Sequence, residues 1–370
     1  MKKRLVIKCG TRVLVSDTQE LKESIASVLV EECAALRKQG YEIVLVTSGA
    51  VALGLRHFQK TRASATPVEK RAASAIGQVE LLRNLIDTGS THSLTFSQLL
   101  LSKDDFQERE RFIRLRDTIE ALISKDTIPI LNENDVTALQ EIGFRDNDHV
   151  AALASLLTES EAVFYLSSTD GLYRYSGGEP VERISSLDAI SEETFSLVEK
   201  EKDKLSLGGM RSKLLSAQLA QQAGASVWII GGESPSNISS ALAGEDVGTA
   251  IRASSNPLGE QLSKRKAWIA LVHDDSGSVL LDQGAVDALT KRSKSLLPVG
   301  ITEVQGEFTE DSVISLISPN KRVVGKGIIS LSSSDLRKIV GMNSKEAGAT
   351  LEKENLDEVI NRDNLVIFPK

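Results

Sequence analysis

The sequence predicts an α/β domain with a largely parallel central sheet flanked by helices, followed by a smaller β-rich domain. Over roughly the first 240 residues, short β-branched runs alternate with amphipathic stretches, a pattern typical of parallel sheets covered by helices. The remainder carries short strand-like runs separated by turn residues. At 370 residues the chain is also longer than one hydrophobic core usually allows, which favours two domains.

The larger domain follows a strand–helix order. Its expected strands cover residues 5–7, 42–46, 129–131, 162–166 and 227–230. Between them, the stretches 21–39, 109–125 and 210–223 place apolar residues at helical spacing. Gly40 and Gly224 follow the first and third of these stretches, where glycine commonly ends a helix.

The pattern weakens over residues 241–266 into glycine, serine, asparagine and charge, which indicates a connection between domains. Beyond it, four short strands are expected, at 278–281, 301–305, 312–317 and 323–329. We therefore assign residues 1–255 to the larger domain, 256–275 to a linker, 276–355 to the β-rich domain and 356–370 to a tail.

Composition excludes several classes of protein. With 41% hydrophobic and 26% charged residues, the chain is neither disordered nor fibrous. Its net charge of −7 argues against a general nucleic-acid-binding surface. The apolar run at 5–7 is too short for a secretory signal, and no segment approaches the roughly 20 apolar residues of a membrane helix. We expect a cytoplasmic protein with no membrane partner, in which Cys9 and Cys33 are buried reduced thiols.

Two small-residue turns follow predicted strands. Lys8 precedes Gly10 and Thr11, and this turn offers the positive charge and backbone N–H groups that phosphoryl transfer needs. The alternative is an exposed lysine before a turn. Ser48 and Gly49 precede a helix start, where N–H groups favour a phosphate or a carboxylate. The alternative there is an ordinary helix cap.

Two further loops carry charge. Acids and amides gather at 132–135 and 146–148, where they could bind a substrate ammonium group, orient polar groups or hold Mg²⁺. A solvated, turn-rich loop is the alternative. Gly208 and Gly209 begin a predicted helix, and Lys213 lies one turn inside it. This arrangement resembles a phosphate-binding loop, although its spacing of glycines and lysine is not that of a Walker A loop. A plain turn with a surface lysine is the alternative. The four histidines are scattered, which favours structural or surface roles.

With these four loops in this order, the chain resembles the amino-acid kinase superfamily, and its motifs resemble the glutamate 5-kinases within it. The motifs are VIKCGT at 6–11, VTSGAVALG at 46–54, AIGQ at 75–78, ERERF at 108–112 with RDT at 116–118, and PILNEND at 129–135 with DND at 146–148. The segments DQGA at 282–285, SLLPVGI at 295–301 and VQGEF at 304–308 resemble a PUA domain. Other members of the superfamily generally lack that domain.

The resemblance implies an amino-acid kinase fold and specific roles. Lys8 and Lys213 would neutralise the transferred phosphoryl group, and Asp148 would orient both lysines. Ser48, Asp135 and Asn147 would contact glutamate, with Gly49 and Glu133 nearby. Magnesium would bind mainly to the phosphates, and no protein ligand is assigned to it. The expected ATP site comprises Lys8, Ser167, Ser168, Leu207, Gly208, Gly209, Met210, Arg211, Ser212 and Lys213.

The implied activity is the phosphorylation of the L-glutamate side-chain carboxylate by ATP, the first step of proline biosynthesis. No general base is needed, because that carboxylate is already ionised at neutral pH. Proline is implied as a feedback inhibitor, a homo-oligomer (dimer or tetramer) is expected, and a γ-glutamyl phosphate reductase would consume the labile product. RNA is not expected as a partner, because residues 276–342 hold 8 Lys or Arg against 7 Asp or Glu.

Two other hypotheses stay open: a kinase of this fold with a different acceptor, and a catalytically weakened regulatory or RNA-binding homologue. The second is motivated by departures from the family pattern. Ser167 and Ser168 stand where a Thr-Asp pair is usual, Leu207 replaces a threonine, and Arg12 replaces a serine. Two more departures are Ser293 in place of a glycine, and the order of residues 143–145, where Arg145 and Gly143 are exchanged. Because Lys8, Asp148 and Lys213 are kept, we expect activity with altered nucleotide affinity.

Overall fold

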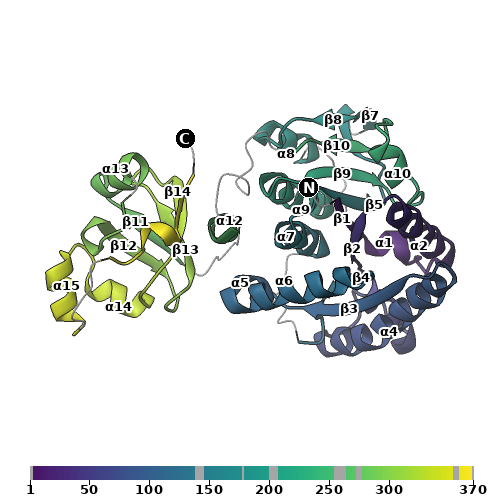
Figure 1. The fold of residues 1–370 in the computed structure, drawn as a ribbon, viewed down its shortest axis with the longest axis horizontal. Coiled ribbons are helices and arrows are strands. Elements are labelled where there is room, and N and C mark those ends of the chain that lie inside the picture. The colour runs from purple at the N-terminus through teal and green to yellow at the C-terminus, as the bar shows by residue number, and fades with distance from the viewer. Residues whose placement is uncertain are drawn as a thin grey trace. The chain divides into compact units, whose positions relative to one another are not determined.

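The computed structural model describes residues 3–137, 146–176, 179–199, 207–253, 264–271, 277–292, 294–352 and 358–368. The chain divides into two compact units, Met1–Pro257 and Leu258–Lys370 (Figure 1). Each unit has its own sheet and its own hydrophobic core.

The first unit is built on an eight-stranded sheet in the order β3-β4-β2-β1-β5-β9-β10-β8. Its neighbouring strands are parallel, except that β10 runs antiparallel to β9. The predicted α/β class with a largely parallel sheet is therefore confirmed. The strands are β1 (Arg4–Cys9), β2 (Glu42–Val46), β3 (Thr95–Leu101), β4 (Thr127–Glu133), β5 (Ala162–Ser167), β8 (Ser186–Leu187), β9 (Ser226–Gly231) and β10 (Thr249–Ile251), with a separate hairpin of β6 (Leu172–Ser176) and β7 (Glu179–Ile184).

Helices cover both faces of this sheet (Figure 1). One layer contains α6 (Arg109–Ser124), α7 (Asn147–Thr158) and α9 (Leu207–Gln222), and the other contains α2 (Glu23–Lys38), α4 (Pro67–Thr91) and α10 (Asn237–Leu242). Because both faces are covered, every residue of β1 is buried. The remaining helices of this unit are α1 (Thr11–Leu14), α3 (Ala50–Leu55), η1 (Arg56–Phe58), α5 (Asp104–Gln107) and α8 (Glu192–Glu199).

Two glycines explain part of the motifs at 46–54 and 75–78. A Cβ atom on Gly54 would lie 1.8 Å from the Ala73 carbonyl oxygen, and one on Gly77 would lie 1.9 Å from the Ala50 carbonyl oxygen. Helices α3 and α4 therefore cross backbone against backbone, and this contact holds the loop before α3 next to the middle of α4.

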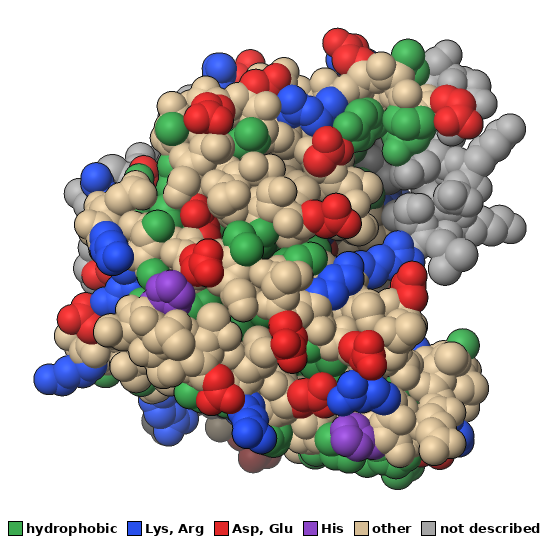
Figure 2. Space-filling view, turned by 90° about the vertical axis from the view of Figure 1, so that its right-hand side faces the viewer, with side chains coloured by type: hydrophobic (Ala, Val, Ile, Leu, Met, Phe, Trp, Pro, Cys, Tyr) green, Lys and Arg blue, Asp and Glu red, His purple; other side chains and the backbone are tan. Residues whose placement is uncertain are grey.

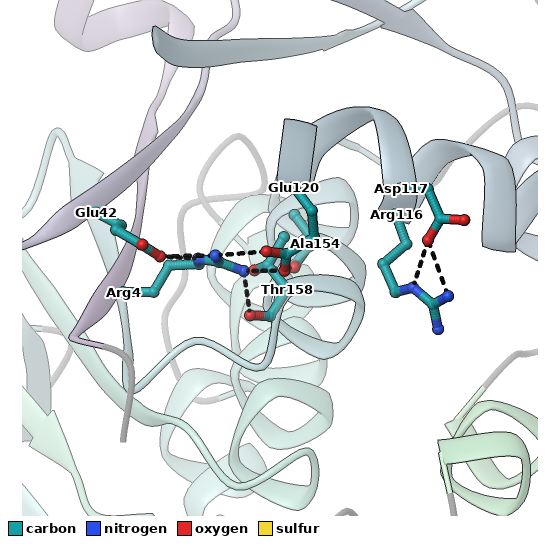
Figure 3. Close-up of polar contacts among 7 residues, drawn as sticks. All are labelled: Arg4, Glu42, Arg116, Asp117, Glu120, Ala154 and Thr158. Atoms are coloured by element: carbon teal, nitrogen blue, oxygen red, sulfur yellow. Dashed lines mark hydrogen bonds and ion pairs between the residues drawn. The ribbon is translucent and has the colours of Figure 1, made fainter. Parts of the chain in front are cut away.

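A fully buried arginine ties the strands to α7 (Figure 3). Arg4 donates to the Glu42 and Glu120 carboxylates, and its Nη1 donates to the Thr158 carbonyl oxygen at 2.7 Å. This carbonyl belongs to the last turn of α7, where a positive charge also suits the helix dipole. Arg116 and Asp117, also drawn, form a separate surface pair.

The second unit has a five-stranded sheet in the order β12-β11-β13-β14-β15. Its strands are β11 (Gly277–Leu281), β12 (Ile301–Gly306), β13 (Val313–Ile317), β14 (Val323–Ile328) and β15 (Leu365–Ile367). Between and before them lie α12 (Lys264–Leu271), α13 (Gln283–Arg292), η2 (Pro298–Gly300), α14 (Ser333–Lys338), α15 (Ser344–Thr350) and η3 (Arg362–Asn364). Helix α12 falls within the stretch assigned to a linker, yet it packs on β14 and β15 and buries Trp268.

Surface and membrane properties follow from the same structure. Acidic and basic side chains are interspersed over the face in Figure 2, without a large field of one sign. Among the described residues, we find no helix whose length and apolar character would allow it to cross a membrane.

Candidate active site

The charged site residues meet at the carboxyl ends of the central strands. Lys8 lies near the end of β1, Ser167 ends β5, and Asp148 lies in the first turn of α7. Open α/β sheets bind ligands at this edge, because the loops that leave parallel strands converge there. The structure thus brings together loops that are distant in sequence.

Asp148 bridges two buried lysines. Its Oδ1 lies 2.6 Å from Lys8 Nζ, and its Oδ2 lies 2.9 Å from Lys213 Nζ. All three residues are at most 7% exposed. Two cations and one anion leave a net positive charge at the sheet edge, and the shared carboxylate fixes both ammonium groups in place.

Burial and charge oppose each other in this cluster. Burial alone would raise the pKa of the Asp148 carboxyl, but Lys213 and Lys8 hold that pKa below its ordinary value. Burial lowers the pKa of the Lys213 ammonium, against the attraction of Asp148. Tyr165 packs beneath the cluster: its ring centroid is 5.3 Å from Lys213 Nζ, and its hydroxyl donates to the Asp148 carbonyl oxygen at 3.2 Å.

A pocket of about 260 Å³ opens beside the three charged residues. It contains much of the predicted ATP site, including Ser167, Ser168, Gly209 and Met210. Ser212 is described but is not among the lining residues, and Arg211 instead places its guanidinium over the Phe195 ring, 5.3 Å from the centroid. Leu207 and Gly208 begin α9, and the structure describes only their backbone.

Two of the predicted glutamate contacts, Ser48 and Asn147, belong to a second set of side chains that are joined by amide hydrogen bonds. We call this set, which consists of Ser48, Asn147, Asn132 and Gln78, the amide group. Asn147 Nδ2 donates to Ser48 Oγ at 3.0 Å and to Asn132 Oδ1 at 2.9 Å. Asn132 Nδ2 in turn donates to Gln78 Oε1 at 2.6 Å. The backbone N–H of Glu133 donates to the side-chain oxygens of Asn132 and Asn147. Neutral hydrogen bonds thus connect the ends of β2 and β4 with α4 and α7.

Asp135 and Gly49 border this amide group. Ser74, one helical turn from Gln78 on α4, donates to Asp135 Oδ2 at 3.1 Å. Burial raises the pKa of the Asp135 carboxyl, although Ser74 and the charge of Arg62 oppose that effect. Gly49 has a φ of +111°, and a Cβ atom there would lie 2.7 Å from Val15 Cγ2, so a larger residue would be strained.

Several residues of the site were not assigned a role from the sequence. Asn132 and Gln78 stand within the quoted motifs, yet only the structure shows that their side chains bind each other. Tyr165 lies inside a buried strand and gave no signal of its own. Tyr173 and Tyr175 also line the pocket, because the hairpin of β6 and β7 follows β5 directly. Residues 143–145, where the family pattern is exchanged, lie outside the described residues.

No dedicated metal cage is evident in the part of the chain that the structure describes, where no three His, Cys, Asp or Glu side chains form a cluster able to hold an ion. Among the described lining residues, Asp148 is the only carboxylate, and it is already ion-paired with two lysines. Magnesium carried on the phosphates of ATP, as expected from the sequence, would need no protein ligand of its own, since Mg²⁺ keeps its waters and binds phosphate oxygens readily.

A largely parallel sheet with two buried lysines beside a pocket at its carboxyl edge has the features that a phosphotransferase of the α/β class needs. Comparison with known proteins supports this class: residues 3–231 match the model of the amino acid kinase family, and residues 277–349 match the PUA domain. The chain is 36% identical to a glutamate 5-kinase of a Synechococcus strain, covering 98% of both chains. It is 35% identical to that of Trichlorobacter lovleyi, covering 99% of this chain and 97% of the relative. The chain belongs to the amino acid kinase family and, within it, to the glutamate 5-kinases.

Proposed function

We propose that this protein transfers the γ-phosphoryl group of ATP to the side-chain carboxylate of L-glutamate, which yields γ-glutamyl phosphate and ADP. One observation carries the proposal. Two successive residues at the start of α7 belong to different groups: Asp148 holds two buried lysines, and Asn147 joins the amide group with Ser48. A phosphoryl donor and a polar acceptor bound to these groups would meet at the N-terminus of one helix.

In this mechanism the chain contributes positioning and charge. Lys8 and Lys213 stabilise the negative charge on the phosphoryl oxygens as the glutamate carboxylate attacks and ADP leaves. Asp148 keeps both ammonium groups fixed, so little reorganisation is needed during transfer. The attacking oxygen is already ionised, and Asp148 therefore acts as an organiser rather than as a base.

The amide group orients the acceptor. Ser48 and Asn147 offer a hydroxyl and an amide to the glutamate carboxylates, and Asp135 offers a carboxylate to the α-ammonium group. Burial disfavours the charged form of Asp135, and a bound ammonium group would restore it. Specificity for a free amino acid over an N-acylated one would follow from this pair.

Further parts of the proposal concern the cellular role. The reaction is the first step of proline biosynthesis, proline acts as a feedback inhibitor, and a γ-glutamyl phosphate reductase consumes the labile acyl phosphate. The location is the cytoplasm, in keeping with the free thiols Cys9 and Cys33. The protein assembles as a dimer or tetramer, and a surface suited to this is the apolar stripe on α4, where Val68, Ile76, Val79 and Ile86 are exposed.

A coupled assay for ADP tests the activity. Glutamate, N-acetylglutamate, aspartate, carbamate and uridylate are offered in turn with MgATP, and glutamate is then repeated with proline. The proposal predicts ADP release that depends on glutamate and falls when proline is added. ADP release with another acceptor, and none with glutamate, would reject glutamate as the substrate. Unchanged rates with proline would reject only the feedback inhibition.

A further inference from the structure

Arg12 gives the nucleotide pocket a third cation. It lies in the second position of α1, its side chain is exposed, and it is one of the residues that line the pocket beside Lys8 and Lys213. Among the residues that the structure describes, its guanidinium has no hydrogen-bond or ion-pair partner. Its backbone carbonyl oxygen, by contrast, accepts from Lys22 Nζ at 2.9 Å.

The other two cations of the pocket differ from Arg12 in being paired. Asp148 is the only carboxylate among the described lining residues, and it is shared by Lys8 and Lys213. Asp170 lies just outside the lining, and its Oδ1 accepts the Tyr173 hydroxyl at 2.8 Å. Arg12 is therefore the one cation among the described lining residues that no protein carboxylate pairs with.

The backbone beneath Arg12 is firmly held. Val13 and Leu14 are buried in the core, and Val13 packs so closely on Gly232 that a Cβ atom there would lie 2.4 Å from Val13 Cγ2. At the start of the same turn, a Cβ atom on Gly10 would lie 3.6 Å from Lys8 Nζ. The long, unpaired side chain of Arg12 thus extends from a fixed turn that lies next to Lys8.

We propose that Arg12 binds the phosphate groups of the nucleotide and sets the affinity of the enzyme for ATP; this rests on the proposed kinase function. A guanidinium presents paired N–H donors that match phosphate oxygens, and it stays charged at any working pH. Ser48, Asn147 and Asp135 do not line this pocket, so Arg12 does not belong to the acceptor side. Because Arg12 is exposed and unpaired, it contributes to the affinity for the nucleotide, whereas the fixed Lys8 and Lys213 contribute to the rate of phosphoryl transfer.

The test compares R12S and R12K with the wild type and with R322S, which removes an exposed arginine from the second unit. Nucleotide binding is measured by calorimetry with MgADP, and the KM values for ATP and glutamate are measured at low and high ionic strength. For R12S we expect nucleotide affinity to fall about tenfold, because hydrogen bonds between charged groups are of that strength. The kcat and the glutamate KM of R12S should stay within about threefold of the wild-type values. The ATP KM of R12S should depend less on ionic strength than that of the wild type, because one charge is lost. R12K recovers part of the affinity, and R322S changes nothing.

Unchanged nucleotide affinity in R12S, or a fall in kcat alone, would overturn the proposal. Thermal melting shows whether each variant is folded. If R12S is not folded, the nucleotide affinity of R12K is compared with that of the wild type instead. The binding measurement needs no acceptor. If the wild type binds MgADP but does not phosphorylate glutamate, the proposed function fails while the role of Arg12 is still decided.

Discussion

The two groups that meet at the start of α7 differ in charge and in how they are held. On the nucleotide side, Lys8, Asp148 and Lys213 form a buried ionic cluster with a net positive charge. On the acceptor side, Ser48, Asn147, Asn132 and Gln78 form a chain of neutral hydrogen bonds. In the proposed mechanism, adjacent positions of one helix therefore have different roles: fixed charge stabilises the transferred group, and neutral donors orient a substrate that brings its own charge.

The largest effect is expected from Lys213→Ala. This change removes one of the two cations that we propose stabilise the transferred group, and loss of one such interaction costs about 100- to 1000-fold in kcat. It should leave the glutamate KM nearly unchanged, because Lys213 lies on the nucleotide side. Steady-state kinetics with glutamate and MgATP measure both values, and Lys125→Ala, at an exposed site after α6, is the matched control. Turnover near the wild-type rate would remove Lys213 from the mechanism.

Asp148→Asn should be next in size. The amide keeps the shape of the side chain but leaves two buried lysines facing each other without an anion, so we expect kcat to fall about 100-fold and the melting temperature to drop. A variant that keeps the wild-type kcat would show that the lysines do not need Asp148 to hold their positions.

The same residue predicts a dependence of stability on pH. Burial opposes ionisation of Asp148, but Lys213 and Lys8 keep its folded-state pKa below the ordinary value. Its contribution to stability is therefore complete above the unfolded pKa of about 4 and is lost as the pH falls through the lower folded value. Between neutral pH and acid, the melting temperature of the wild type should fall further than that of D148N. Parallel curves would contradict this assignment.

Asn147→Ala, one position earlier, should affect a different kinetic parameter. It removes the two hydrogen bonds that Asn147 Nδ2 donates, while Asn132 Oδ1 keeps only the Glu133 backbone N–H as a donor. Each lost hydrogen bond costs about 0.5–1.5 kcal/mol. We expect the glutamate KM to rise about tenfold or more while the ATP KM changes little. A rise in the ATP KM alone would contradict the separation of the two groups.

The smallest effect is expected for the thiols, which lie outside both groups. Burial raises the pKa of the Cys9 thiol to about 12, and it also raises the pKa of Cys33. Neither thiol should react with a disulfide reagent in the native protein at pH 8, whereas both should react after unfolding. Rapid labelling of the native enzyme with loss of activity would show that the loop after Lys8 opens to solvent.

The sequence predicted the central strands and the helices at 23–38 and 109–124, because their apolar periodicity is strong. It did not predict α4, whose apolar residues are sparse, although Pro67 and the capping box between Thr66 and Glu69 were readable signals. Strand β3 was missed for a different reason: it lies at the edge of the sheet, so its residues are largely half exposed and carry little β pattern.

At the site, the sequence predicted residue types but not which side chains contact each other. Lys8, Asp148 and Lys213 were grouped by resemblance, and the single carboxylate between two ammonium groups emerged only from the fold. The link from Asn132 to Gln78 spans 54 positions, so no local pattern could reveal it. Arg12 was noted only as a departure from the family pattern. The structure adds that it lines the pocket, which no sequence pattern indicated.

The most direct test of the account is whether the product is an acyl phosphate of glutamate. The wild-type enzyme is incubated with MgATP, glutamate and hydroxylamine, which attacks an acyl phosphate to give a hydroxamate and free phosphate. We predict that γ-glutamyl hydroxamate and ADP form together, and that omission of glutamate abolishes both. ADP formed with glutamate but without hydroxamate, or no ADP under any of these conditions, would contradict transfer to the carboxylate.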